Sequence, residues 1–287
     1  MLDGMKFNGI PMVSYTDTLE NIQKDFETRG IPTDLPGFYD HPVFMEIDAK
    51  HPEYLNNYAR FVLSKSYSKE YLQSAEFKIR TVADAFHQEL VRDGRLGACM
   101  DMCMVLSKIL DQVGVWNFVV NGALTTTYPE ESGIPNGYYW PIDIGPARAG
   151  HAWIFAPPFT VIDITIGHQN EDPLYAPFTP DFVYSQESAD TVVGIEDICS
   201  SVIQAEMHLQ GIPMLPEGLF IRRPELMPFF KIFNQTIFTH NKTEFKYIPV
   251  AISISDTPLE HITDLQLNGK YGHEIFEEKI KPVITPD

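Results

Sequence analysis

The clearest pattern of apolar and polar positions lies in the middle of the chain, over residues 98–113. Apolar side chains there follow the i, i+3, i+4, i+7, i+8, i+11 spacing of one helix face, at Met102, Val105, Leu106, Ile109, Leu110 and Val113. Gly114 follows, as a glycine commonly does after the last turn of a helix. We therefore predict a helix over residues 98–113 that packs one face against the core.

Short apolar runs on the C-terminal side of this helix predict strands. Residues 115–120 predict a buried strand that ends at Asn121-Gly122. Residues 151–156 and 161–166 predict two further strands, which the Pro157–Thr160 turn would join as an antiparallel hairpin. The segment between, residues 123–150, is rich in glycine and proline and predicts a long functional connection or lid.

The rest of the chain has weaker patterns. Residues 52–93 and 195–210 favour helices, and residues 247–253 favour a strand. The whole is an α+β pattern. We expect an irregular, wrapping N-terminal segment over residues 1–50, a core over residues 51–185, and a C-terminal α/β extension over residues 186–287 that could belong to the same globule.

Charge and composition narrow the function classes. The chain has 287 residues with 44% hydrophobic and 21% charged residues, which is typical of a globular protein. Its formal net charge of −18 disfavours nucleic acid and acidic membrane surfaces as partners. The N-terminal sequence has no signal-peptide pattern, and no apolar run is long enough to span a membrane. We expect a cytoplasmic protein with free thiols and no cofactor.

The first candidate catalytic residue is Cys99, which lies in the first turn of the predicted 98–113 helix, two residues after Gly97. A helix N-terminus and a nearby imidazolium both lower the pKa of a cysteine thiol. His151 begins the first strand of the predicted hairpin, and Asp163 lies on the second. A carboxylate at that position would orient the imidazole, so the order predicts nucleophile, base and orienting group.

At these residues the chain resembles the transglutaminase-like superfamily of cysteine enzymes. The matching pieces, in chain order, are Gly97-Ala98-Cys99, Gly114-Val115, Gly122, His151-Ala152-Trp153 and Asp163-Ile164-Thr165. The resemblance covers about residues 80–170. It implies a papain-like α/β core with the cysteine helix on an antiparallel sheet, and thioester chemistry by a Cys99, His151 and Asp163 triad. Peptide or amide hydrolysis is the expected reaction, with acyl transfer to an amine as the alternative.

The substrate would be a protein, a peptide or a small amide. The resemblance implies an oxyanion donor besides the backbone N–H of Cys99, for which Gln88 and Trp153 are the candidates. Tyr139 and Trp140, in the segment before His151, could line or cover the cleft.

Other functions remain open from sequence. Cys99, Cys103 and His151 could bind zinc, although the sequence offers no fourth ligand and we expect no metal. Cys103, one turn after Cys99, is more simply a core residue. An inactive binding protein on the same fold is a second alternative, and the acidic charge alone suggests an inhibitor or decoy protein. The oligomeric state is not encoded in these patterns.

Overall fold

The computed structural model describes residues 6–143, 150–169, 172–189, 192–214 and 216–284. Its centre is an antiparallel sheet with the strand order β7-β6-β5-β3-β9-β8, and β4 pairs with the C-terminal half of β3. The strands are β3 (Phe118–Thr127), β4 (Gly137–Tyr139), β5 (His151–Ala156), β6 (Phe159–Asp163), β7 (Val183–Ser185), β8 (Thr236–His240) and β9 (Thr243–Ser253).

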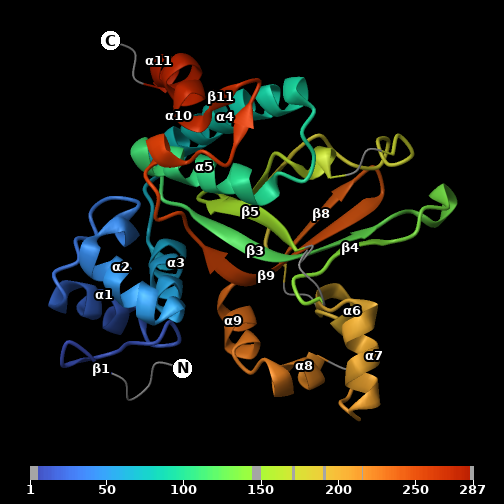
Figure 1. Ribbon diagram of the computed structural model, residues 1–287, viewed down its shortest axis with the longest axis horizontal. Coiled ribbons are helices and arrows are strands. Elements are labelled where there is room, and N and C mark those ends of the chain that lie inside the picture. The colour runs from blue at the N-terminus through green and yellow to red at the C-terminus, as the bar shows by residue number, and fades with distance from the viewer. Residues whose placement is uncertain (1–5, 144–149, 170–171, 190–191, 215, 285–287) are drawn as a thin grey trace.

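Two long helices, α4 (Lys69–Asp93) and α5 (Cys99–Gln112), cover one face of this sheet (Figure 1). The C-terminal elements pack against them: β10 (Gln266–Leu267), β11 (Lys270–Tyr271), α10 (Gly272–Ile275) and α11 (Lys281–Ile284). The apolar stripe of α5 is buried here with Ala152 and Ile154 of β5, as the periodicity of residues 98–113 predicts.

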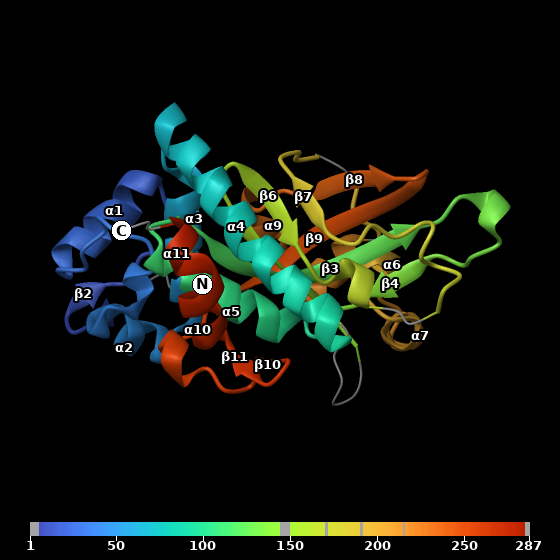
Figure 2. The ribbon, with the colours of Figure 1, turned by 90° about the horizontal axis from the view of Figure 1, so that it is seen from above.

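Two further groups of elements pack against the sheet away from α4 and α5 (Figures 1 and 2). The N-terminal group consists of β1 (Lys6–Phe7), β2 (Ile10–Pro11), α1 (Leu19–Thr28), α2 (Pro42–Lys50) and α3 (Leu55–Ser64). Its aromatic core is continuous with Phe118 and Trp153 of the sheet. The second group consists of α6 (Ile195–Ile198), α7 (Ser201–Leu209), α8 (Pro216–Arg222) and α9 (Leu226–Ile232).

Several expectations are confirmed. The helix of residues 98–113 is α5, with Met102 and Ile109 fully buried, and the helical pattern of residues 52–93 corresponds to α3 and α4. The predicted hairpin is β5 and β6, which pair antiparallel, although β6 spans Phe159–Asp163 instead of residues 161–166 and the turn is limited to Pro157-Pro158. The arrangement is α+β, as the sequence predicts. Residues 186–287 contribute β8 and β9, and β9 lies in the sheet beside β3.

The strand expected over residues 115–120 is wrong in both limits. β3 begins at Phe118 and continues through Gly122 to Thr127. Asn121-Gly122 is therefore the site of a register shift between β3 and β9 rather than the end of the strand. A Cβ atom at Gly122 would lie 2.1 Å from the carbonyl oxygen of Ile248 and 2.5 Å from the Trp153 ring. This glycine lets neighbouring strands and a large ring approach closely. Because β3 extends to Thr127 and β4 spans Gly137–Tyr139, part of the predicted 123–150 connection is strand, and its residues 144–149 lie outside the described residues.

Two other expectations differ from the structure. The helix expected over residues 195–210 is divided into α6 and α7, because Ser200 caps the N-terminus of α7 and its N–H bonds to the carbonyl of Ile142. The first 50 residues contain α1 and α2 where an irregular segment was expected. α1 buries Ile22 and Phe26 against the aromatic core, so tertiary packing stabilises helices in a region that its prolines made look irregular.

Candidate active site

Cys99 is the first residue of α5, and its side chain is partly exposed. It lines a cleft of about 580 Å³ together with residues from β3, β4, β5, β9 and the loops between them. The other lining residues are Gly97, Met100, Asn121, Gly122, Tyr139, Pro141, Ile142, Gly150, His151, Ala152, Gln169, Arg223, Val250 and Ala251. The thiol is thus buried enough to be positioned and open enough to meet a ligand.

His151 and Asp163 form a buried ion pair beside this cleft. The Nε2 atom of His151 lies 2.6 Å from Oδ2 of Asp163, and both residues are 1% exposed. Because Ile154 lies opposite Ile162 in the β5–β6 register, Asp163 lies diagonally across from His151 instead of directly opposite. The side chains still meet, because both point to the same face of the sheet.

Asp163 is held as a carboxylate by four hydrogen bonds from three neighbouring residues. Its Oδ1 atom accepts hydrogen bonds from the backbone N–H of Thr165 at 2.9 Å and from the Thr165 hydroxyl at 2.8 Å. Its Oδ2 atom accepts from His151 and, at 3.0 Å, from the hydroxyl of Tyr247. Burial alone would raise the pKa of Asp163, but His151 and Thr165 outweigh it and lower the pKa below its usual value.

The second ring nitrogen of His151, Nδ1, is available to interact with the Cys99 thiol. Nε2 faces the carboxylate and therefore carries a proton, while Nδ1 is buried without a nitrogen or oxygen partner in the described part of the chain. The Cys99 thiol interacts with this imidazole and with the backbone N–H of Ala152. Cys99, His151 and Asp163 are therefore brought together in the order that the sequence predicts.

The electrostatics of the three groups favour a thiolate and an imidazolium. Burial opposes ionisation of Cys99, yet the hydrogen bond and the charge of His151 outweigh it, so the pKa of Cys99 lies below the usual 9.0. Burial likewise lowers the pKa of His151, but the interactions with Asp163 and Cys99 outweigh it and raise the pKa to about 10. Both shifts favour the thiolate–imidazolium form of the pair over the neutral form.

Of the residues proposed from sequence to surround Cys99, His151 and Asp163, some line the cleft and others do not. Gly97 and Tyr139 line the cleft, and the Tyr139 ring lies 5.7 Å from the His151 ring. Gln88 is exposed on α4 and does not line the cleft, so it is not placed as an oxyanion donor. Trp140 does not line the cleft either, because its indole N–H donates to the backbone oxygen of Glu196 at 2.7 Å.

Trp153 has a packing position instead of a place in the cleft. It is 2% exposed, and its ring packs against those of both His151 and Tyr247, at centroid distances of 6.4 Å and 5.2 Å. Its indole ring borders a different cavity, on the face of the sheet opposite to α5. Trp153 therefore supports His151 from behind and is not positioned as an oxyanion donor.

Four further residues at the site were missed in the sequence. Tyr247 binds Asp163, while Asn121, Gln169 and Arg223 line the cleft. Asn121 directly precedes the glycine of the register shift, which is a usable signal for a side chain near a site. The other three come from segments whose place beside Cys99 depends on sheet pairing and loop packing, for which the chain carries no local pattern.

Cys103 lies one turn after Cys99 and was an alternative zinc ligand. Cys103 lies on the buried face of α5, and this burial raises its pKa well above the usual value. Within the described ranges, no group of three or more histidine, cysteine, aspartate and glutamate side chains is arranged to hold a metal ion.

Among the described residues, none of the helices combines the length and apolar character needed to cross a bilayer.

Comparison of this chain with known protein families, with curated proteins and with solved structures found no significant match.

Proposed function

We propose that this protein is a cysteine-dependent acyl-transfer enzyme that hydrolyses an amide or peptide bond, with Cys99, His151 and Asp163 as its triad. The observation that carries the proposal is the contact of a helix-terminal thiol with a histidine that a buried carboxylate holds at 2.6 Å. The sequence resemblance to transglutaminase-like, papain-like enzymes supports the same chemistry and a papain-like arrangement of helix and sheet.

In the proposed reaction, the Cys99 thiolate attacks the carbonyl carbon of the substrate and forms a tetrahedral intermediate. The Nδ1–H of the His151 imidazolium then protonates the leaving amine, and the C–N bond breaks to give a thioester on Cys99. A water molecule, deprotonated by the now neutral His151, attacks the thioester and releases the acid. Asp163 keeps the imidazole oriented and stabilises its positive charge throughout.

The negative oxygen of the intermediate needs hydrogen-bond donors. The backbone N–H of Cys99 belongs to the first turn of α5, whose amides have no intrahelical acceptor. It can therefore donate to an oxyanion that develops at the carbonyl attacked by its own side chain. Asp101 lies in the same turn, and its ion pair with Arg95, at 3.1 Å, offsets a charge that would oppose the thiolate.

The first test is the pH dependence of iodoacetamide alkylation, resolved for each cysteine by mass spectrometry. We expect Cys99 to react rapidly well below pH 8.5, and the buried Cys103 and Cys199 to serve as internal controls. In His151→Ala, Cys99 should return to ordinary thiol behaviour. Equal reactivity of all three thiols, or no effect of the histidine, would favour a binding protein without this chemistry.

A second measurement addresses acyl transfer itself. We expect 4-nitrophenyl acetate to acetylate Cys99 and release a burst of nitrophenolate, which Cys99→Ala abolishes. Adding methylamine to the acetylated protein then compares the two acceptors. Release of acetate at an unchanged rate supports hydrolysis, whereas a large increase with N-methylacetamide as product supports transfer to an amine.

A further inference from the structure

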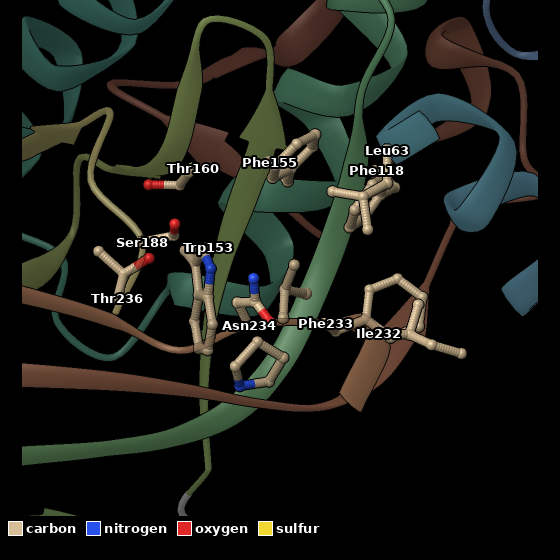
Figure 3. A pocket seen from close by; sticks show the side chains of 12 residues that line it. Leu63, Phe118, Trp153, Phe155, Thr160, Ser188, Ile232, Phe233, Asn234 and Thr236 are labelled. Carbon is tan, nitrogen blue, oxygen red and sulfur yellow. The ribbon is translucent and has the colours of Figure 1, made fainter. Parts of the chain in front are cut away.

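A second cavity lies behind the sheet, on the face opposite to α5. It has a volume of about 280 Å³ and shares no lining residue with the Cys99 cleft. Figure 3 shows Phe118 of β3 and Trp153 of β5 projecting into it. Their strand neighbours, Asn121 on β3 and Ala152 on β5, line the Cys99 cleft instead. His151, two residues before Trp153 and on the same face of β5, also lines the Cys99 cleft, so the two spaces lie at different positions along β5.

The walls of this cavity are mainly carbon. Aromatic rings and aliphatic groups come from α3, β3, β5 and β9, and the C-terminal end of α9 closes one side with Ile232 and Phe233. Phe118, Trp153 and Phe233 are each less than 5% exposed, so they form the floor. A floor of this kind favours an apolar ligand body, above all a ring that can pack against the aromatic faces.

Polar groups gather on one side only. Ser188 and Asn234 are exposed at the mouth, where the Ala189 N–H donates to the Gln235 carbonyl at 2.8 Å and holds the two segments side by side. The hydroxyls of Thr160 and Thr236 are both occupied by backbone carbonyl groups. The side chains of Ser188 and Asn234 make no hydrogen bond with any described residue, so they can bind one polar group of a ligand.

Charge and size define the ligand further. Among the described residues, none that lines the cavity is charged, so a charged ligand would lose its hydration without gaining an ion pair from them. An apolar protein cavity of about 150 Å³ accommodates benzene, so about 280 Å³ accommodates one ring with a short substituent. We propose that this cavity is a binding site for a neutral small molecule with an aromatic or short aliphatic body and one hydrogen-bonding group.

The probe for the test is 4-propylphenol, which has this size and polarity, and 4-propylbenzoate is the charged control. Binding is followed through the three tryptophan indole N–H signals in NMR spectra of the ¹⁵N-labelled protein and by calorimetry. We expect saturable one-to-one binding that shifts the Trp153 signal and leaves those of Trp116 and Trp140 in place. The benzoate should bind at least tenfold more weakly.

Variants locate the site. Ile232→Trp, at the half-buried edge of the cavity, should weaken binding of 4-propylphenol at least tenfold, whereas Leu209→Trp, an equal enlargement at a residue 86% exposed on α7, should not. The double variant Ser188→Ala and Asn234→Ala changes only exposed side chains and should weaken binding severalfold while the fold persists. Absence of saturable binding, or binding that neither cavity variant weakens, overturns the proposal.

This site does not depend on the proposed acyl-transfer activity. Cys99→Ala should bind 4-propylphenol as the unchanged protein does, because Cys99 lines a cleft that has no lining residue in common with the cavity. A loss of binding in Cys99→Ala would show that the probe occupies the cleft and would contradict the assignment.

Discussion

The hydroxyl of Tyr247 donates a hydrogen bond to Oδ2 of Asp163 at 3.0 Å, across a separation of 84 residues in sequence. Tyr247 lies on β9 and Asp163 at the end of β6, and the two strands are not neighbours in the sheet. The tyrosine therefore reaches under β5 and β3 to a carboxylate that also holds His151. This contact ties the C-terminal part of the chain to the candidate active site.

Removing this hydroxyl should cost stability. In Tyr247→Phe the ring still packs against Trp153, but the ionised carboxylate of Asp163 loses one donor in a buried site. We expect the free energy of unfolding to fall by about 1.5–3 kcal/mol, the usual range for a hydrogen bond to a charged group. Urea unfolding followed by circular dichroism measures this change.

Tyr138→Phe is the matched control, because Tyr138 is only partly buried and stacks on Trp140 without a hydrogen bond from its hydroxyl among the described residues. A change within about 0.5 kcal/mol is expected there. If both variants lose the same stability, the Tyr247 contact with Asp163 has no special role.

Neutralising Asp163 should make Cys99 an ordinary thiol. In Asp163→Asn the buried His151 loses the carboxylate that raises its pKa to about 10, and burial then favours the neutral ring. Without an imidazolium beside it, the thiolate of Cys99 is less stable, so the pKa of Cys99 rises. Alkylation of Cys99 by iodoacetamide at pH 6 should slow at least tenfold, since one pKa unit is a factor of ten in thiolate.

Asp264→Asn changes the net charge equally at an exposed residue outside the Cys99 cleft and should leave the alkylation rate unchanged. The Asp163 mechanism fails if the two variants react alike.

The proximity of Cys99, His151 and Asp163 could be predicted because their signals are local. The stripe of α5 places Cys99 at a helix start, and a short hairpin brings His151 and Asp163 onto adjacent strands. Tyr247 carries no such signal. Its position depends on the pairing of β9 with β3, which joins parts of the chain more than 100 residues apart and has no counterpart in local periodicity.

The oxyanion candidates show the same limit. Trp153 shares a strand face with His151, which the sequence reveals, but its large ring fills the space behind the histidine instead of the cleft. Gln88 lies on α4 as its helical pattern predicts, but it is on the side of the helix that faces solvent. Which side of a strand or helix meets a cleft is decided by packing between distant elements.

The stability of the protein should depend on the pH through Asp111. This residue lies at the C-terminal end of α5, where burial raises its pKa to about 7 although Tyr39 donates a hydrogen bond to it. The folded state therefore holds a proton that the unfolded chain releases near pH 4. Stability from this group is greatest below pH 4 and declines as the pH rises to about 7, by a few kcal/mol at most.

Asp111→Asn should remove that dependence. An asparagine mimics the protonated acid, since its oxygen can accept from Asn117 at 2.9 Å and its amide can donate to Tyr39. We expect the variant to gain stability relative to the unchanged protein between pH 5 and pH 8, measured by urea unfolding at each pH. Asp34→Asn, at an exposed position, should follow the unchanged protein; parallel curves for all three proteins would refute the role of Asp111.

A final prediction concerns the close packing at Gly122. A Cβ atom there would lie 2.1 Å from the backbone oxygen of Ile248 and 2.5 Å from the Trp153 ring, both far inside contact distance. Backbone cannot move as a flexible side chain does, so Gly122→Ala must displace β9 or Trp153, and with Trp153 the support of His151. We expect a loss of more than about 3 kcal/mol in the free energy of unfolding. Gly137→Ala on β4, where the nearest atom would be 3.6 Å away, should cost about 1 kcal/mol or less, and an equal loss in both variants would mean that the strands at Gly122 are not packed this tightly.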